Sequence, residues 1–143
     1  MQAPDPFENF LGYHLRRLSV AVMSDLTAAL APLGLKPAEA SILYLLKSQP
    51  GLTQSEIGKL LGIQRANMAP LIAGLMRRGL VERRSVDGRS QALKLTPAGE
   101  KLRAAAWAAN AAHESRIFAP LTAPARENLI TQLRTLWQPH ANN

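Results

Sequence analysis

The chain has 143 residues, and 47% of them are hydrophobic, which is enough to bury the core of one domain of ordinary size. Seventeen lysines and arginines outnumber ten acidic residues, so the net charge is +7, and a chain this basic usually meets an acidic partner such as nucleic acid. The absence of cysteine excludes disulfides, thiolate-rich zinc sites and thiol-based redox sensors. The N-terminus has no signal-peptide pattern and no segment approaches the ~18 apolar residues of a membrane span, so we expect a cytoplasmic protein with no membrane partner.

The first predicted elements are two helices. Apolar residues recur every three or four positions over residues 7–30, which predicts one long amphipathic helix. Pro32 and Gly34 are typical of a helix end, and Pro37 is well placed at the first position of the next helix. That second helix is expected to end before the Pro50–Gly51 pair.

Two shorter helices follow, joined by a glycine. Thr53 and Glu56 have the spacing of a capping box, so they predict the start of a third helix, which Gly62 ends after about two turns. A fourth amphipathic helix is expected over residues 64–78, with Pro70 inside it as a cause of bending or of a shifted start. A short helix joined by a tight glycine turn to a second amphipathic helix is a helix-turn-helix, whose second helix can lie in the DNA major groove.

The region after the fourth helix predicts a small β-hairpin and two more helices. Extended runs at residues 80–84 and 92–95 flank the Asp87–Gly88 pair, which is a hairpin signal. A hairpin in this position is the wing of a winged helix-turn-helix. Thr96 and Pro97 then cap a long helix that reaches about residue 118, and a last helix ends near residue 137.

The basic residues are concentrated on the predicted helix-turn-helix and wing. Eight bases and two acids between Lys59 and Lys94 give this segment +6 of the net +7. Such a run is often only a solvated helix face, and charge alone would fit DNA, RNA or an anionic membrane. Because the charge coincides with the helix-turn-helix and the hairpin, the sequence favours DNA.

Three motifs in this region resemble the MarR family of bacterial transcription regulators. They are Leu75–Arg83, Asp87–Ser90 and Leu93–Glu100, of which the wing signature with the following Leu-Thr-x-x-Gly is the most specific. One departure is Lys36, which stands where relatives often have a threonine or serine helix cap.

The resemblance covers nearly the whole chain and implies a fold that is mainly α with a small β-wing. It places a winged helix-turn-helix at about residues 37–96, and N- and C-terminal dimerisation helices at about 5–31 and 97–138. It implies a homodimeric repressor, a palindromic operator in double-stranded DNA, and frequent release by a small aromatic or phenolic acid.

The first turn of the fourth helix holds the candidate base-reading residues, Gln64, Arg65 and Asn67. Arginine can bind guanine and asparagine can bind adenine by paired hydrogen bonds, each worth about 1–3 kcal/mol of discrimination. Gln64 and Asn67 could instead only cap the helix. Arg77 and Arg78, at the other end, could do no more than favour the helix C-terminus through the dipole.

The wing holds the other candidate DNA contacts. Arg89 at its tip is expected to enter the minor groove with its guanidinium held by Asp87, although an Asp-Gly turn with an idle arginine is the alternative. Three further bases are expected to contact phosphates: Arg83, Arg84 and Lys94.

Candidate effector-binding residues lie on the first two helices. Arg17 follows Tyr13 by four residues and His14 by three, so the three side chains can share a helix face, and Tyr44 is on the second helix. An arginine with a tyrosine or histidine can hold an aromatic carboxylate, so we expect a small anionic aromatic effector, either an aromatic acid or its coenzyme A thioester. The alternative is a surface arginine pair and an interface tyrosine.

Dimerisation is expected from the residues themselves as well as from the resemblance. The alanine-rich stretch 104–112 permits close helix approach, and the terminal helices carry more aromatic surface than they can bury alone. Phe7, Phe10 and Trp137 are the residues expected at the interface, with Trp107 and Phe118 as the other aromatics.

Two other function classes remain as alternatives. A sequence-nonspecific nucleic-acid-binding protein would show the same charge, but it would lack the preference of roughly 10³-fold or more that a repressor has for its operator. A small dimeric enzyme is the least favoured, since the sequence has no nucleophile elbow, phosphate-binding glycine loop, HExxH motif or carboxylate cluster. No cofactor is expected, and the scattered His14, His113 and His140 do not indicate a metal site.

Overall fold

Helices make up most of the computed structural model, which describes residues 3–85, 87 and 91–141. The N-terminal half contains α1 (Leu11–Leu30), the 3₁₀ turn η1 (Ala31–Leu33), α2 (Pro37–Ser48), α3 (Gln54–Leu61) and α4 (Arg65–Arg77). The strands β1 (Val81–Ser85) and β2 (Gln91–Leu95) follow, and then α5 (Pro97–Ile117), α6 (Ala123–Trp137) and the 3₁₀ turn η2 (Gln138–His140). This helical order with a two-stranded antiparallel wing confirms the predicted fold class.

The first helix is shorter than its apolar pattern predicted. It begins at Leu11 rather than Phe7, because residues 6–9 form a turn. In that turn the Phe7 N–H donates to the Asp5 carboxylate at 2.9 Å, and the Phe10 N–H donates to the Phe7 carbonyl at 2.9 Å. The carboxylate thus satisfies a backbone donor outside the helix, and the apolar residues before Leu11 stay exposed.

The other helix starts agree with the predicted capping chemistry. Thr53 and Glu56 form the expected box, with the Glu56 N–H 3.2 Å from the Thr53 hydroxyl and the Thr53 N–H 2.8 Å from the Glu56 carboxylate. Lys36 has no hydroxyl to offer, but its own N–H donates to the Glu39 carboxylate at 2.8 Å, so half of a capping box remains. Pro70 lies inside α4 without ending it.

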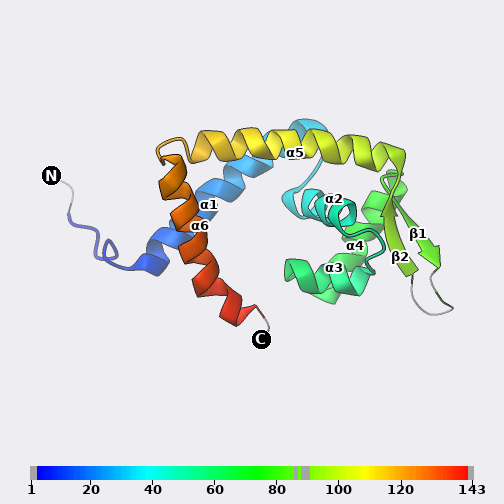
Figure 1. Ribbon diagram of the computed structural model, residues 1–143, viewed down its shortest axis with the longest axis horizontal. Helices are drawn as coiled ribbons and strands as arrows, with labels where there is room; N and C mark the ends of the chain where they lie inside the picture. Colours follow the sequence, from blue (N-terminus) through cyan, green and yellow to red (C-terminus); the bar gives the residue numbers. More distant parts are fainter. Residues whose placement is uncertain (1–2, 86, 88–90, 142–143) are drawn as a thin grey trace.

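Figure 1 shows α5 spanning the long direction of the molecule, from the hairpin at one end to the corner with α6 at the other. The winged helix-turn-helix lobe, which comprises α2, α3, α4 and the hairpin, lies along the N-terminal half of α5. α1 packs along α5 and is antiparallel to it, so the N-terminal half of α1 lies at the end far from the wing. α5 therefore connects the lobe to α6, while the C-terminal end of α1 also reaches the lobe.

The hydrophobic core lies inside the winged helix-turn-helix lobe. Its largest fully buried apolar side chains come from the end of α1 and from α2, α3, α4 and β2: Leu30, Ile42, Leu43, Ile57, Met68, Ile72, Leu75 and Leu93. Ala106 of α5 closes the core on one side. No described residue of α6 is buried, and Leu30 is the only residue of α1 that is.

Arg78 has a structural role that the sequence did not predict. Its Nη1 donates to the carbonyl of Gly34 at 2.8 Å, across 44 residues. Gly34 has a positive φ of 65°, which is the conformation that turns the chain from η1 towards α2. The side chain therefore ties the end of α4 to this turn, in addition to any interaction with the helix dipole.

The residues Thr96 to Gly99 form a close junction between the wing and α5. The Thr96 hydroxyl donates to the Gly79 carbonyl at 2.5 Å and accepts the Gly99 N–H at 3.0 Å, which caps α5. The Thr96 N–H donates to the Leu80 carbonyl at 3.1 Å. A Cβ on Gly99 would lie 2.0 Å from that same carbonyl oxygen, so only glycine fits here. The Leu-Thr-x-x-Gly motif is thus a packing requirement.

The variant Gly99→Ala should lose stability by about 3 kcal/mol or more, because the new methyl overlaps backbone that cannot shift without moving β1. The matched control is Gly74→Ala inside α4, where the nearest atom to the new Cβ is 3.8 Å away on a flexible arginine. That change should be neutral or stabilising by up to about 1 kcal/mol. Urea unfolding of both variants measures the difference. Equal free energies of unfolding would contradict the claim that only glycine fits at position 99.

Candidate nucleic-acid interface

The helix-turn-helix is closed by two glycines. Gly62 ends α3 with a φ of 67°, and the Ile63 N–H donates back to the Gly58 carbonyl at 2.9 Å. Gly58 is buried, and a Cβ there would lie 3.1 Å from both the Ile63 carbonyl oxygen and the Met68 side chain. The two helices therefore approach closely, and the chain enters α4 through the extended Gln64.

The three predicted base-reading residues lie together, exposed, at the start of α4. Gln64 occupies the N-cap position, but its side chain makes no capping hydrogen bond, and its carbonyl accepts the Asn67 N–H at 2.9 Å instead. Within the described residues, the side chains of Arg65 and Asn67 have no hydrogen bond or ion pair either. The side chains of Gln64 and Asn67 therefore do not cap the helix, and all three side chains present polar groups to solvent.

Arg83 of β1 points into the space between α3, α4 and the hairpin. Its Nη2 donates to Gln54 Oε1 at 3.3 Å and its Nη1 to Gln91 Oε1 at 3.4 Å. Its Nε lies 3.3 Å from the sulfur of Met76. The long bonds orient the guanidinium without using all of its donors, so Arg83 is a cation held in place between these elements.

The other wing bases are on the opposite face of the hairpin. Arg84 alternates with Arg83 along β1 and pairs with Ala92, while Lys94 pairs with Glu82 on the same face as Arg84. Arg84 and Lys94 are both exposed. The hairpin thus separates the predicted phosphate contacts into one cation that faces the groove and two that face away from it.

The wing is attached to the start of α3 as well as to α5. The Leu93 N–H donates to the Leu52 carbonyl at 2.9 Å, and Thr53 forms a β-bridge with Ala92. This short pairing fixes the position of the hairpin relative to the helix-turn-helix. Asp87 is exposed near the wing tip, where its carbonyl accepts the Ser85 hydroxyl at 3.0 Å, whereas Arg89 lies outside the described residues.

These elements enclose an open groove of about 840 Å³ between the helix-turn-helix and the wing. Lys59, Arg65 and Arg83 supply its positive charge, and Asp87 lies at its wing side. Polar side chains, the glycines of the turn and the apolar Ile63 and Met68 form the rest of its walls. The groove combines cations with the exposed amide of Gln64, and such groups contact phosphates and base edges.

The candidate effector residues on α1 do lie together. The Tyr13 hydroxyl donates to the Asp5 carboxylate at 2.7 Å and accepts from Arg17 Nη1 at 3.0 Å. His14 Nε2 donates to the Glu8 carbonyl at 2.6 Å. Hydrogen bonds from the Phe7 N–H and the Tyr13 hydroxyl lower the pKa of Asp5. The chain's own carboxylate therefore occupies the place beside tyrosine and arginine that was predicted for a ligand.

Tyr44 does not join that group within one chain. Its ring packs edge-on against Trp107 of α5, with the ring centroids 5.0 Å apart at 85°. Trp107 precedes His113 by six residues in α5, and Tyr13 precedes Asp25 by twelve residues in the antiparallel α1, so the contact between Asp25 and His113 separates the two. The Tyr44 hydroxyl is buried without a hydrogen-bond partner among the described residues, and burial raises the pKa of Tyr44.

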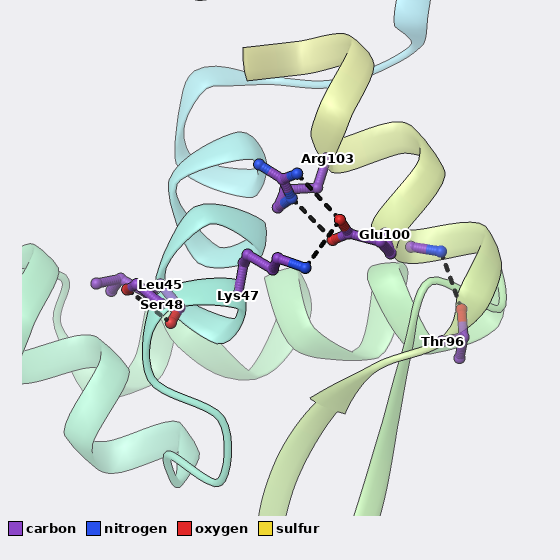
Figure 2. A network of polar contacts seen from close by, with 7 residues as sticks. Leu45, Lys47, Ser48, Thr96, Glu100 and Arg103 are labelled. Atoms are coloured by element: carbon purple, nitrogen blue, oxygen red, sulfur yellow. Dashed lines mark hydrogen bonds and ion pairs between the residues drawn. The ribbon is translucent and has the colours of Figure 1, made fainter.

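The sequence did not indicate the ion-paired cluster beside Tyr44, which we call the α2–α5 latch: Lys47, Glu100 and Arg103. The Glu100 carboxylate accepts from Arg103 Nε at 2.8 Å and Nη2 at 3.0 Å, and it lies 3.1 Å from Lys47 Nζ (Figure 2). These bonds, first from Arg103 and then from Lys47, lower the pKa of Glu100 to about 2, and Glu100 raises the pKa of Arg103. The Glu100–Arg103 spacing was a visible signal for a helical pair, but the contact with α2 was not.

A second cluster joins α1 to the far end of α5. His113, only 1% exposed, has Nδ1 2.5 Å from the Asp25 carboxylate, which also accepts from Arg116 at 2.6 Å. Hydrogen bonds from His113 and then Arg116 lower the pKa of Asp25. This contact fixes α1 against α5 and is structural.

Among the described residues, no helix by itself has both the length and the apolar content to cross a membrane. Only the bent pair Leu11–Leu33 and Pro37–Ser48, at 74° to each other, reaches both when the two are taken together.

The fold and this groove define a winged helix-turn-helix DNA-binding protein, and comparison with known proteins gives the family. The MarR family profile matches residues 33–90. The HTH-type transcriptional repressor Rv2887 of Mycobacterium tuberculosis is 33% identical over 128 residues, which are 88% of this chain and 92% of the relative. The chain therefore belongs to the MarR family of transcriptional regulators, a family of repressors and not of enzymes, which confirms the resemblance.

Solved structures of relatives agree over almost the whole chain. The transcriptional repressor CouR bound to a 23-mer DNA duplex is 36% identical with a TM-score of 0.89, covering 95% of this chain and 99% of that one. CouR bound to p-coumaroyl-CoA is 35% identical with a TM-score of 0.84, covering 95% and 97%. Rv2887 of M. tuberculosis in complex with salicylic acid is 32% identical with a TM-score of 0.73, covering 94% and 97%.

Proposed function

We propose that the protein is a homodimeric repressor that reads a palindromic operator through α4 and the wing, and that a small aromatic anion releases it. The observation that carries the DNA part is the cluster of Gln64, Arg65 and Asn67 at the first turn of α4, exposed and without internal partners. A sequence-nonspecific binder needs only cations, whereas these groups suit base edges. The structure of CouR bound to a DNA duplex supports double-stranded DNA as the partner, and chromosomal DNA as partner would place the protein in the cytoplasm.

Arg65→Ala should weaken binding to a duplex selected from a random pool by about 1–3 kcal/mol and relax the preference at one base pair of each half-site. Arg84→Ala should instead weaken all duplexes alike and lower the slope of log affinity against log salt by about one, because it removes a phosphate contact. Fluorescence anisotropy at several salt concentrations measures both. A uniform loss in both variants would show that α4 does not read bases.

The exposed apolar surface at the end far from the wing supports the dimer. α6 makes no extensive packing contact with α1–α5 in the described part of the chain, and the ion pair from Arg126 to Glu114 at 3.0 Å is its main polar link to α5. Phe10 is 64% exposed and Trp137 is 57% exposed, and Phe7 is also exposed. A single chain leaves these faces in water, and a second copy would bury them.

Light scattering after size exclusion should give about 31 kDa, twice the 15.5 kDa chain mass, at micromolar concentration. Trp137→Ala should shift this towards monomer because it removes an aromatic anchor from the proposed interface. The control is Leu60→Ala, which removes a similarly exposed apolar side chain from α3, away from α1 and α6. A monomer for the unmodified protein would exclude the dimer and, with it, a palindromic operator.

The ligand part of the proposal rests on two groups of side chains. At Tyr13, His14 and Arg17 the hydroxyl and the cation already interact around Asp5. At Tyr44 the hydroxyl is buried and unpartnered among the described residues, which costs roughly 1–3 kcal/mol, and a polar ligand group would recover it. We therefore place the aromatic ring of the effector beside Tyr44, with its acid group towards Arg103. The complexes of the relatives with salicylic acid and p-coumaroyl-CoA support an effector of this class.

Salicylate and p-coumaroyl-CoA, titrated against the operator complex, test the response directly. Arg103→Gln should raise the salicylate concentration needed for half-release about tenfold or more, since it removes a partly buried charged donor. Arg17→Ala should change it little. The opposite result would assign the ligand to Tyr13, His14 and Arg17 as first predicted, and no release by either compound would contradict the ligand response.

A further inference from the structure

The α2–α5 latch is where the DNA-binding lobe is ion-paired to the helix that leads away from it. Lys47 lies in the last turn of α2, and Glu100 lies in the first turn of α5. Among the residues that the structure describes, theirs is the only ion pair between these two helices. Figure 2 shows the Glu100 carboxylate between the two cations, facing α2.

The latch has one more positive than negative group. Two cations share one carboxylate, which stays ionised at neutral pH because its pKa is about 2. The Arg103 side chain is only 16% exposed, and Arg103 lies on α5 one turn before Trp107, whose ring packs on Tyr44. The aromatic pair Tyr44 and Trp107 therefore borders a cluster in which a carboxylate already binds both cations.

We propose that Glu100 is an internal competitor of the effector. An aromatic carboxylate seated beside Tyr44 and Trp107 takes Arg103 and Lys47 from Glu100, and this exchange opens the latch. The inference rests on the ligand response proposed above and assigns its regulation to one residue.

Breaking the ion pairs of the latch would affect the DNA-binding elements, because only a few residues and hydrogen bonds separate them from Glu100. Glu100 follows Thr96 by four residues, and Thr96 is bonded to Gly79 and Leu80 at the end of α4 and the start of the wing. Once Lys47 is no longer held, α2 and the rest of the lobe can change angle against α5. Two recognition helices must match one turn of DNA, about 34 Å, so a change of lobe angle in a dimer lowers operator affinity.

The variant Glu100→Gln tests the competition, because it keeps the shape of the side chain and removes its charge. Salicylate binding to the DNA-free protein, followed by tryptophan fluorescence, should tighten about two- to fivefold, the range that exposed ion pairs contribute. In the unmodified protein, bound operator should weaken salicylate binding, because the latch couples the two sites. In Glu100→Gln, the ratio of the salicylate affinities without and with operator should fall towards one. Glu114→Gln is the matched control: it removes the same charge from α5 at an ion pair with Arg126, and both values should stay as in the unmodified protein.

A merely structural role for Glu100 would lower the melting temperature without tightening salicylate binding, and that result would overturn the inference. Glu100→Asp keeps the charge and withdraws the carboxylate by one methylene, so it should change the salicylate affinity and its dependence on operator in the same direction as Glu100→Gln, but by less. This variant serves as the test if Glu100→Gln does not fold. If p-coumaroyl-CoA releases the operator and salicylate does not, the ligand response stands and the latch inference fails. If neither compound acts, both fail.

Discussion

The contact between Gly99 and the Leu80 carbonyl is the constraint on which the rest of the molecule depends. It decides where α5 leaves the wing, because the helix can start there only without a side chain at that position. Thr96 completes the junction by bonding to the end of α4 and capping α5 with one hydroxyl. The recognition helix, the wing and the long connecting helix therefore meet within a few residues, so this junction sets where the DNA-binding surface is joined to α5.

The local features of the fold were predictable from the sequence, because they depend on neighbouring residues. The capping box of Thr53 and Glu56, the stop at Gly62 and the hairpin all lie where their chemistry predicted. The first helix was predicted too long, since the apolar pattern continues to Phe7 while Asp5 binds the backbone there and holds it in a turn. Periodicity shows which face is apolar but does not show where a side chain competes for the backbone.

The candidate sites were predictable only in part, for a related reason. Arg83 was predicted to contact phosphate, and it is exposed, but the sequence did not show that strand alternation turns it towards Gln54, 29 residues away in the chain. The latch and the contact between Asp25 and His113, 88 residues apart, depend on which helix faces cross, and no spacing rule within one segment predicts that. Tyr44 was predicted to share one site with Tyr13 because they lie on the first two helices, whereas within one chain Tyr44 packs on Trp107 and Tyr13 bonds to Asp5 and Arg17.

The lack of buried residues in α6 has a consequence for the life of the chain before it assembles. A lone helix of 15 residues is only marginally stable in water, and α6 gains little from the rest of its own chain. If a second copy covers α6, the helix folds fully only when two chains meet. Newly made chains at low concentration would then expose an apolar, partly unwound C-terminus to proteases. Turnover would then remove single chains faster than assembled ones, so the amount of active regulator would rise more steeply than its rate of synthesis.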